Sequence, residues 1–233
     1  MSSPLYEPAL HFVHDHLMRE HGVSLEWRRY RFLHCVRVAG IGRTVGEAEG
    51  LDADKLELAC LLHDVAKFDT RWHVDHGRGA ARLVRPWLVE HGMNLDDTEE
   101  ICQGIAMHTD GRYNYPPESP DYTGVADFTT EPTILARSVG DCDNVDRFAV
   151  YRIYESLAHK HFESLDLPAQ LSVLKKSLAR VQAQRSYHCA TATCQRLWEQ
   201  ALDTQTAFFH TLLGQLDAAL PAYTATTNEL DED

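Results

Sequence analysis

The sequence has no apolar run long enough to cross a membrane, no Cys-x-x-Cys pair and no internal repeat, and a secretory leader is not expected from its first residues. A transmembrane helix needs about 20 consecutive, mostly apolar residues, so a membrane-spanning protein is not expected. The first residues, 1–7, contain neither a basic nor an apolar segment, which favours a cytoplasmic location. Without Cys-x-x-Cys, a zinc finger is disfavoured, and the six cysteines are expected to be reduced thiols.

Positive charge is also scarce. The chain has 22 Lys and Arg against 35 Asp and Glu, which gives a net charge of −13. This balance argues against binding of a nucleic-acid duplex, which needs a basic stripe, and no membrane partner is expected. An anionic small molecule would have to be held locally, by a metal and a few Arg or Lys side chains. The 14 histidines are a high number for this length and permit a metal centre.

The apolar residues recur at helical spacing, and no segment shows a convincing strand pattern, so the sequence predicts an all-α fold. Residues 1–165 are expected to form one helical domain. Residues 166–220 are expected to form a C-terminal helical hairpin packed on it, with a surface suited to a pocket or a homodimer. Residues 221–233 are expected to be a disordered acidic tail. Helices are predicted over residues 4–21, 25–50, 52–67, 76–91, 96–108, 132–161, 168–187 and 190–217.

Residues 109–131 form a predicted loop that is rich in Pro, Gly, Tyr, Asp and Thr. Loops of this length are usually functional or disordered. We interpret this one as a lid or substrate loop.

The most informative stretch is 56–67, in which His63 and Asp64 directly follow a strongly apolar run. Imidazole and carboxylate groups are both ligands for divalent transition metals. Buried without a metal or another partner, they would cost on the order of several kcal/mol in desolvation. A single His-Asp pair is weak evidence, because helix capping or a buried His–Asp hydrogen bond explains most such pairs.

Further metal-ligand residues occur at or near predicted helices. His34 lies within an apolar stripe, and His76 stands at a helix start beside Gly77. Each has an ordinary alternative, such as a core histidine or a solvated acidic face, but all of these alternatives together are much less plausible. His73 is considered a decoy, and the run His11, His14, Asp15 and His16 is interpreted as a solvated helix face. The candidate set is His34, His63, Asp64, His76, His108 and Asp143.

This set resembles the H…HD…D signature of the HD-domain superfamily of metal-dependent phosphohydrolases, which are helical bundles. Within it, the chain is most similar to the bacterial HD hydrolases that cleave diadenosine tetraphosphate symmetrically. The resemblance covers roughly residues 28–150. The similar pieces are Arg31-Phe32-Leu33-His34, Leu61-Leu62-His63-Asp64-Val65-Ala66-Lys67, His76-Gly77-x-x-Ala80, Ile105-Ala106-Met107-His108-Thr109-x-Gly111-Arg112 and Cys142-Asp143-x-x-Asp146.

The resemblance implies one or two divalent transition-metal ions, with Fe or Mn favoured by the mixed ligand set. It implies His34, His63, Asp64 and Asp143 as the basic ligands, and His76 and His108 as ligands of a second ion that Asp64 would bridge. The last carboxylate motif here reads Gly140-Asp141-Cys142-Asp143 where the family usually has Ala-Asp. This leaves Asp141 and Asp143 as alternatives, and we choose Asp143 for its spacing to the residues that follow.

The resemblance further implies hydrolysis of a phosphate ester or anhydride by a metal-activated water, with a nucleotide or dinucleoside polyphosphate as substrate. Asp64 and Lys67 are the candidate catalytic residues, and Lys67 is also expected to contact phosphate from one turn beyond His63. Arg78, Arg112 and Arg147 are weaker candidates for phosphate contacts, with surface ion pairs as the alternative.

Two other functions fit the same residues. Some HD-fold proteins use a di-iron centre as oxygenases that cleave C–C or C–P bonds, and a similar ligand set would serve that chemistry. The chain could also be a nucleotide-binding module that retains the fold without catalysis. Residues 113–131 and those beyond about 165 are not part of the resemblance, so they do not identify the substrate.

Overall fold

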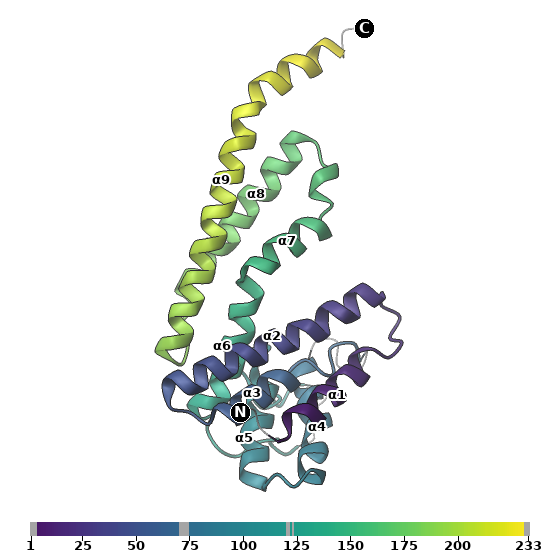
Figure 1. Cartoon of the computed structure of the whole chain (residues 1–233), viewed down its shortest axis with the longest axis vertical. Coiled ribbons are helices and arrows are strands. Elements are labelled where there is room, and N and C mark those ends of the chain that lie inside the picture. The colour runs from purple at the N-terminus through teal and green to yellow at the C-terminus, as the bar shows by residue number, and fades with distance from the viewer. Residues whose placement is uncertain (1–3, 70–74, 120–121, 123, 231–233) are drawn as a thin grey trace. The chain divides into compact units, whose positions relative to one another are not determined.

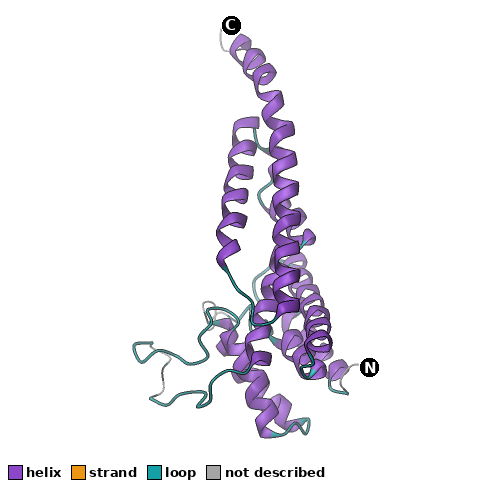
Figure 2. Cartoon of the chain, turned by 90° about the vertical axis from the view of Figure 1, so that its left-hand side faces the viewer, coloured by secondary structure: helices purple, strands orange, loops and turns teal. Residues whose placement is uncertain are grey.

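The computed structural model describes residues 4–69, 75–119, 122 and 124–230, and every regular element in these ranges is a helix (Figures 1 and 2). The predicted all-α fold is confirmed. His73, the predicted decoy, lies outside the described residues. The α-helices are α1 (Tyr6–Leu17), α2 (Leu25–Glu49), α3 (Ala53–Leu62), α4 (His76–Glu90), α5 (Leu95–Met107), α6 (Ile134–Phe148), α7 (Val150–His159), α8 (Leu167–Ala183) and α9 (Ala192–Leu230), with short 3₁₀ turns η2 (Phe162–Ser164) and η3 (Gln184–Ser186).

The chain divides into two compact units. The first contains Met1–Asp146 together with the distant segment Cys189–Gln195, and the second contains Arg147–His188 and Arg196–Asp233. The predicted boundary after residue 165 falls inside the second unit, between η2 and α8. None of the helices described here has the combination of length and apolar composition needed to cross a bilayer.

Helix α3 is the centre of the first unit. It packs against α1, α2 and α5, and α4 packs in turn against α5. Six of its residues, Leu56 and Leu58 to Leu62, are at most 1% exposed, so α3 is buried on every side along this stretch. Such a helix belongs to the interior of a bundle. The chain that leaves its C-terminal end is therefore already in the core.

The start of α3 is fixed by its sequence. Gly50 follows α2 with a φ of +67°, a left-handed conformation that glycine adopts without steric cost. The carboxylate of Asp52 then accepts a hydrogen bond from the backbone N–H of Lys55 at 3.0 Å, which satisfies a donor that the first turn leaves unpaired. Asp52 is therefore the N-cap of α3.

The largest differences between the predicted and the observed helix ends are at three places. Helix α3 ends at Leu62, where the sequence predicts a helix through Lys67. Ala149 is extended (φ −70°, ψ 171°) and separates α6 from α7, which are predicted as one helix. Helix α9 continues through Pro221 to Leu230, where a disordered tail is predicted. Apolar periodicity carries straight through the first two breaks, so it does not reveal them.

The second unit has its own apolar core. Trp198 is 1% exposed, and its ring lies 4.9 Å from that of Phe148 and 5.7 Å from that of Tyr187, between ring centroids. Edge-to-face pairs of this kind add to the energy of burial. The stripe predicted on α8 supplies further buried side chains, namely Leu171, Leu174 and Val181.

The contact between α2 and α3 provides a test of the fold with a matched control. A Cβ atom added at Gly46 would lie 2.6 Å from the Cα of Ala53, whereas one added at Gly40, on the same helix, would meet nothing within 4 Å. We expect Gly46→Ala to lower the free energy of unfolding by about 1–3 kcal/mol through overpacking. Gly40→Ala should leave it unchanged or raise it by up to about 1 kcal/mol, because alanine is the better helix former. Urea denaturation measures both, and equal effects would contradict the close packing.

Candidate metal centre

The six predicted metal ligands come together in the first unit, from five helices. His34 lies on α2, His76 is the first residue of α4, and Asp143 lies on α6. His63 and His108 directly follow the last residues of α3 and α5, and Asp64 is next to His63. Asp64 is 2% exposed, and even the most accessible side chain, that of His76, is only 12% exposed.

Two of the histidines also end their helices. The Nδ1–H of His63 donates to the carbonyl of Cys60 at 2.6 Å, and the Nδ1–H of His108 donates to the carbonyl of Ile105 at 2.6 Å. The last carbonyls of a helix lack backbone partners, so each imidazole satisfies one of them. Because a carbonyl only accepts, Nδ1 must carry the proton in both rings. The neutral ring then presents the lone pair of Nε2 on its other side.

His34 is oriented in the same way by a carboxylate. Its Nδ1 donates to Oδ2 of Asp146 at 2.7 Å, and Arg37 donates to both oxygens of Asp146, at 2.8 and 3.0 Å. The Nε2 of His34 faces the cluster, 3.0 Å from Oδ1 of Asp143. A carboxylate behind an imidazole is the usual support for a metal-binding histidine.

The N-terminus of α4 comes close to the C-terminus of α5 because residue 77 is a glycine. A Cβ atom there would lie 2.8 Å from the carbonyl oxygen of Ile105 and 3.0 Å from Nδ1 of His108. The ring centroids of His76 and His108 are consequently only 5.1 Å apart. This glycine therefore lets the start of α4 approach the end of α5.

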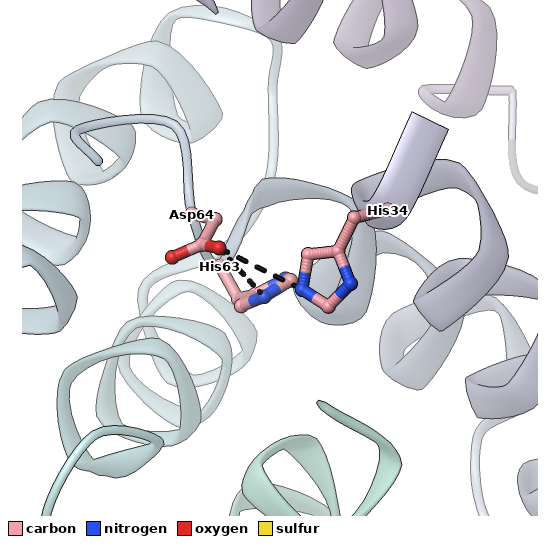
Figure 3. A group of neighbouring side chains, drawn as sticks. All are labelled: His34, His63 and Asp64. Carbon is pink, nitrogen blue, oxygen red and sulfur yellow. Dashed lines mark ion pairs between the residues drawn. The ribbon is translucent and has the colours of Figure 1, made fainter. Parts of the chain in front are cut away.

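Asp64 lies between the histidines, and its two oxygens face different pairs of them. Its Oδ2 is 3.7 Å from Nε2 of His34 and 3.5 Å from Nε2 of His63 (Figure 3). Its Oδ1 is 3.1 Å from Nε2 of His76 and 3.6 Å from Nε2 of His108. The donor atoms form three overlapping groups, in each of which all atoms lie within 4.8 Å of one another. The groups are His34–His63–Asp64, His63–His108–Asp143 and Asp64–His76–His108.

The unsatisfied atoms of the cluster fit a metal. Among the described residues, the buried Nε2 atoms of His34 and His63 and the Oδ1 of Asp64 have no hydrogen-bond partner of acceptable geometry. Buried polar groups are almost always paired, so three such atoms facing one another need an explanation. Imidazole lone pairs that face carboxylate oxygens repel them unless a cation lies between. Nitrogen and oxygen donors in this arrangement suit a divalent transition metal.

The charges around Asp64 keep it ionised. Burial raises the pKa of this carboxyl, but the Arg31 guanidinium, which donates to its Oδ2 at 2.5 Å, and the neighbouring His63 outweigh burial and hold the pKa well below its usual range. Burial lowers the pKa of His34, yet contacts with Asp143 and Asp146 leave it raised. Burial dominates at His76 and lowers its pKa, which favours the neutral imidazole that a metal requires.

The two alternatives for the last carboxylate have different surroundings. Asp143 faces His34, His63 and His108. Asp141 points elsewhere: its Oδ2 accepts the backbone N–H of Ala190 at 2.6 Å, and its carboxylate groups with the thiols of Cys189 and Cys194. All six cysteines are free thiols.

The predicted phosphate-binding side chains have different surroundings. Lys67 is at the cluster, with its Nζ 3.1 Å from Nε2 of His76. Arg112 is exposed and paired with Asp110 at 2.9 Å, which is the surface ion pair considered as its alternative. Arg147 belongs to the second unit and lines a pocket there.

Arg78 is 2% exposed, so it is neither a surface ion pair nor open to a ligand. Its guanidinium donates to Asp75 at 2.9 Å and to Asp110 at 3.2 Å, and lies 5.0 Å from the ring centroid of Tyr115. It therefore ties the start of α4 to the long loop that begins after His108.

The long loop is held in place by its own side chains. The amide of Asn114 donates to the carbonyl of Phe128 and accepts the backbone N–H of the same residue, both at 2.8 Å. Tyr115 is 5% exposed, and the guanidinium of Arg82 also lies over its ring. The described part of residues 109–131 contains no helix or strand, as predicted.

Sequence reasoning gave no role to the residues that support the ligands. Arg31 neutralises Asp64, Asp146 orients His34, and Arg37 fixes Asp146. Their spacing offered a signal, because Arg31 lies three residues before His34 and Asp146 three residues after Asp143. Residues at this separation share a helix face.

A scan against protein-family models matches the HD domain over residues 31–147. This is half of the chain and contains all six candidate ligands, so the chain belongs to the HD-domain family. A curated relative, the deoxyguanosinetriphosphate triphosphohydrolase-like protein of Paracoccus denitrificans, is 27% identical over 179 residues. The match covers 68% of the chain but only 46% of that relative, so the chain spans less than half of its length.

Among solved structures, a predicted HD superfamily hydrolase from an uncultured Thermotogales bacterium matches with a TM-score of 0.58. The match covers 91% of the chain and 93% of that structure at 16% identity. At this identity the likeness concerns the fold, and it agrees with the helical architecture described above.

Two isosteric substitutions test the choice between the acidic residues of α6. We expect Asp143→Asn to lower the metal content of the purified protein severalfold, because it removes a charged ligand atom from the cluster. Asp141→Asn, two residues away, should keep the wild-type content. Plasma mass spectrometry of the purified proteins measures both, with circular dichroism to confirm helix content. Loss of metal from the Asp141 variant alone would reverse the assignment.

Proposed function

We propose that the chain is a metal-dependent phosphohydrolase that acts on a nucleotide or a dinucleoside polyphosphate. The observation that carries the proposal is that the Nε2 atoms of several imidazoles converge on two buried carboxylates. The rings of His34, His63 and His108 are each held in orientation by a hydrogen bond from Nδ1–H to a carboxylate or a backbone carbonyl. Membership of the HD-domain family supports the hydrolytic assignment.

The arrangement supports a centre of two ions. His34, His63, Asp64 and Asp143 would hold the first, and His76 and His108 would hold the second. Asp64 is suited to bridge them because its two oxygens face different histidines. The mixed nitrogen and oxygen set favours Fe or Mn over Mg. Such ions lower the pKa of coordinated water and neutralise phosphoryl oxygens.

The side chains of the chain have separate tasks in this proposal. Arg31 keeps Asp64 ionised, so that this carboxylate stays a ligand of the ions that would activate the water. Lys67, beside His76, is the cation positioned to contact a phosphate at the cluster. Arg112, on the exposed loop, would reach a phosphate only by leaving Asp110. Arg78 acts indirectly, by holding the loop.

The number of ions is the first prediction of this proposal. Protein purified without oxygen should contain about two transition-metal ions per chain. The double variant His76→Ala/His108→Ala should contain about one, because it removes two ligands of the second ion and leaves those of the first. Elemental analysis of both proteins decides the matter. One ion in both would reduce the site to His34, His63, Asp64 and Asp143.

The substrate class rests on two kinds of likeness. The Paracoccus denitrificans relative carries the name of a nucleoside triphosphate hydrolase, and the sequence motifs resemble those of diadenosine tetraphosphate hydrolases. Both substrates present a polyphosphate chain to the enzyme. We therefore propose a nucleoside polyphosphate, with deoxyguanosine triphosphate and diadenosine tetraphosphate as the two compounds to compare.

Activity should follow the supporting residues as well as the ligands. With Fe or Mn bound, the protein should hydrolyse at least one of the two compounds, and Asp64→Ala should abolish this activity. Asp146→Asn should lower kcat/KM by about 10–100-fold, the usual effect of losing a carboxylate behind a metal-binding histidine. The products, separated by chromatography, identify the bond that is cleaved.

Absence of hydrolysis with every polyphosphate and phosphodiester would contradict the proposal. Oxygen consumption by the iron-loaded protein would then favour the di-iron oxygenase. Absence of bound metal after gentle purification would favour a nucleotide-binding module.

A further inference from the structure

The second unit contains a small, strongly basic pocket. It lies among α7, α8, α9 and the last residues of α6, and its volume is about 140 Å³. Five of its lining residues are cationic, and among the described residues that line it none is acidic. The cations are Arg147, Arg152, Lys160, Lys176 and Arg180.

This concentration of positive charge runs against the composition of the chain. Acidic residues outnumber basic ones by 35 to 22 overall, yet residues 147–180 contain six Lys or Arg and three Asp or Glu. One of the three carboxylates, that of Glu155, pairs with Arg152 at 2.7 Å without lining the pocket. The pocket is therefore a local region of positive charge on an acidic protein, and such regions attract anions.

The cations of the pocket repel one another. Lys160 is exposed overall, but partial burial lowers its pKa, and the nearby Arg180 and Arg152 lower it further. Burial likewise lowers the pKa of Arg180, with further contributions from Arg152 and Arg147. Repulsion between these like charges destabilises the second unit. An anion bound among them would be attracted to all of them and would offset this repulsion.

The floor of the pocket is buried and held by hydrogen bonds. The guanidinium carbon of Arg180 lies 5.4 Å from the ring centroid of Phe148, which is 4% exposed. The amide of Gln205 donates to the carbonyl of Phe148 at 2.9 Å, and the hydroxyl of Ser177 donates to the carbonyl of Val173 at 2.8 Å. A guanidinium stacked on a fixed ring loses little freedom when it binds an anion.

The size of the pocket limits the ligand. Sites for drug-sized molecules are about 300–1,000 Å³, whereas a cavity of about 150 Å³ holds a molecule of the size of benzene. A volume of about 140 Å³ therefore has room for one or two phosphate groups and not for a nucleoside. Several Arg and Lys side chains around a small volume are the usual environment of a phosphate.

We propose that this pocket binds a diphosphate group, either as free inorganic diphosphate or as the terminal part of a nucleotide whose nucleoside remains outside. The proposal stands on the second unit alone and does not depend on hydrolysis at the metal centre. It gives Arg147 a phosphate-binding role in this pocket, where the sequence predicted one at the metal centre.

Titration calorimetry on the full chain tests the proposal. Inorganic diphosphate is added with a chelator present throughout, so that metal ions do not contribute to binding. We expect Lys160→Gln/Arg180→Gln to weaken binding at least about tenfold, since two charged contacts are lost. The control is Lys175→Gln/Arg196→Gln, which removes the same charge from two exposed residues of the second unit outside the pocket. It should bind within about twofold of the wild type.

A second variant covers the case in which loss of the Arg180 stack disturbs the fold. Lys160→Gln/Lys176→Gln leaves the contact between Arg180 and Phe148 in place, both lysines are exposed, and it should weaken binding to a similar degree. Thermal melts confirm that each variant is folded. Wild-type affinity in this variant, or equal weakening in the control, would overturn the proposal.

Adenosine diphosphate, titrated in parallel, distinguishes the two sources of the ligand. Binding that is similar in strength to that of diphosphate, and equally sensitive to the pocket variants, assigns the pocket to the phosphates of a nucleotide. Binding of diphosphate alone assigns it to the free anion. If neither compound shows binding that depends on the pocket residues, the proposal is wrong.

Discussion

The buried carboxylate of Asp64 is the constraint on which the rest of the first unit depends. An ionised group that is 2% exposed is tolerated only with compensating charge and hydrogen bonds. Arg31 supplies part of that charge, and the histidines around both oxygens supply nitrogen atoms that would share a cation with it. The side chains around Asp64 come from five helices that end at or pass by this carboxylate. The packing of these helices therefore determines the geometry of the candidate metal centre.

The sequence predicted the helical fold and the candidate ligands because both depend on local features. The apolar spacing of each helix is visible in a window of some 15 residues, and His63 with Asp64 carries its chemistry in two adjacent positions. The supporting contacts are not local. Asp146 and Arg37 are 109 residues apart, and nothing near either one identifies its partner. Only the folded structure places the side chains of α2 within reach of Asp146 on α6.

The errors at helix ends have a related cause. The predicted helix through Lys67 stops at Leu62, where His63 uses its own side chain to satisfy a carbonyl that the helix would otherwise have paired. Apolar periodicity does not distinguish a histidine that continues a helix from one that ends it. The burial of Arg78 could not be predicted from the sequence for a similar reason. It depends on contacts with the long loop after His108, whose path the sequence does not specify.

The first unit is discontinuous in sequence, since Cys189–Gln195 belongs with Met1–Asp146. Within it, the N–H of Ala190 bonds to Asp141, and the N–H of Thr193 bonds to Glu49. During synthesis on the ribosome, these two acceptors emerge long before their donors, which are separated from Asp146 by more than forty residues. Chains generally fold from the N-terminus as they emerge, so the first unit must wait in an incomplete form while the intervening segment is translated. Its last contacts, made by Ala190 and Thr193, can form only after that segment has been made.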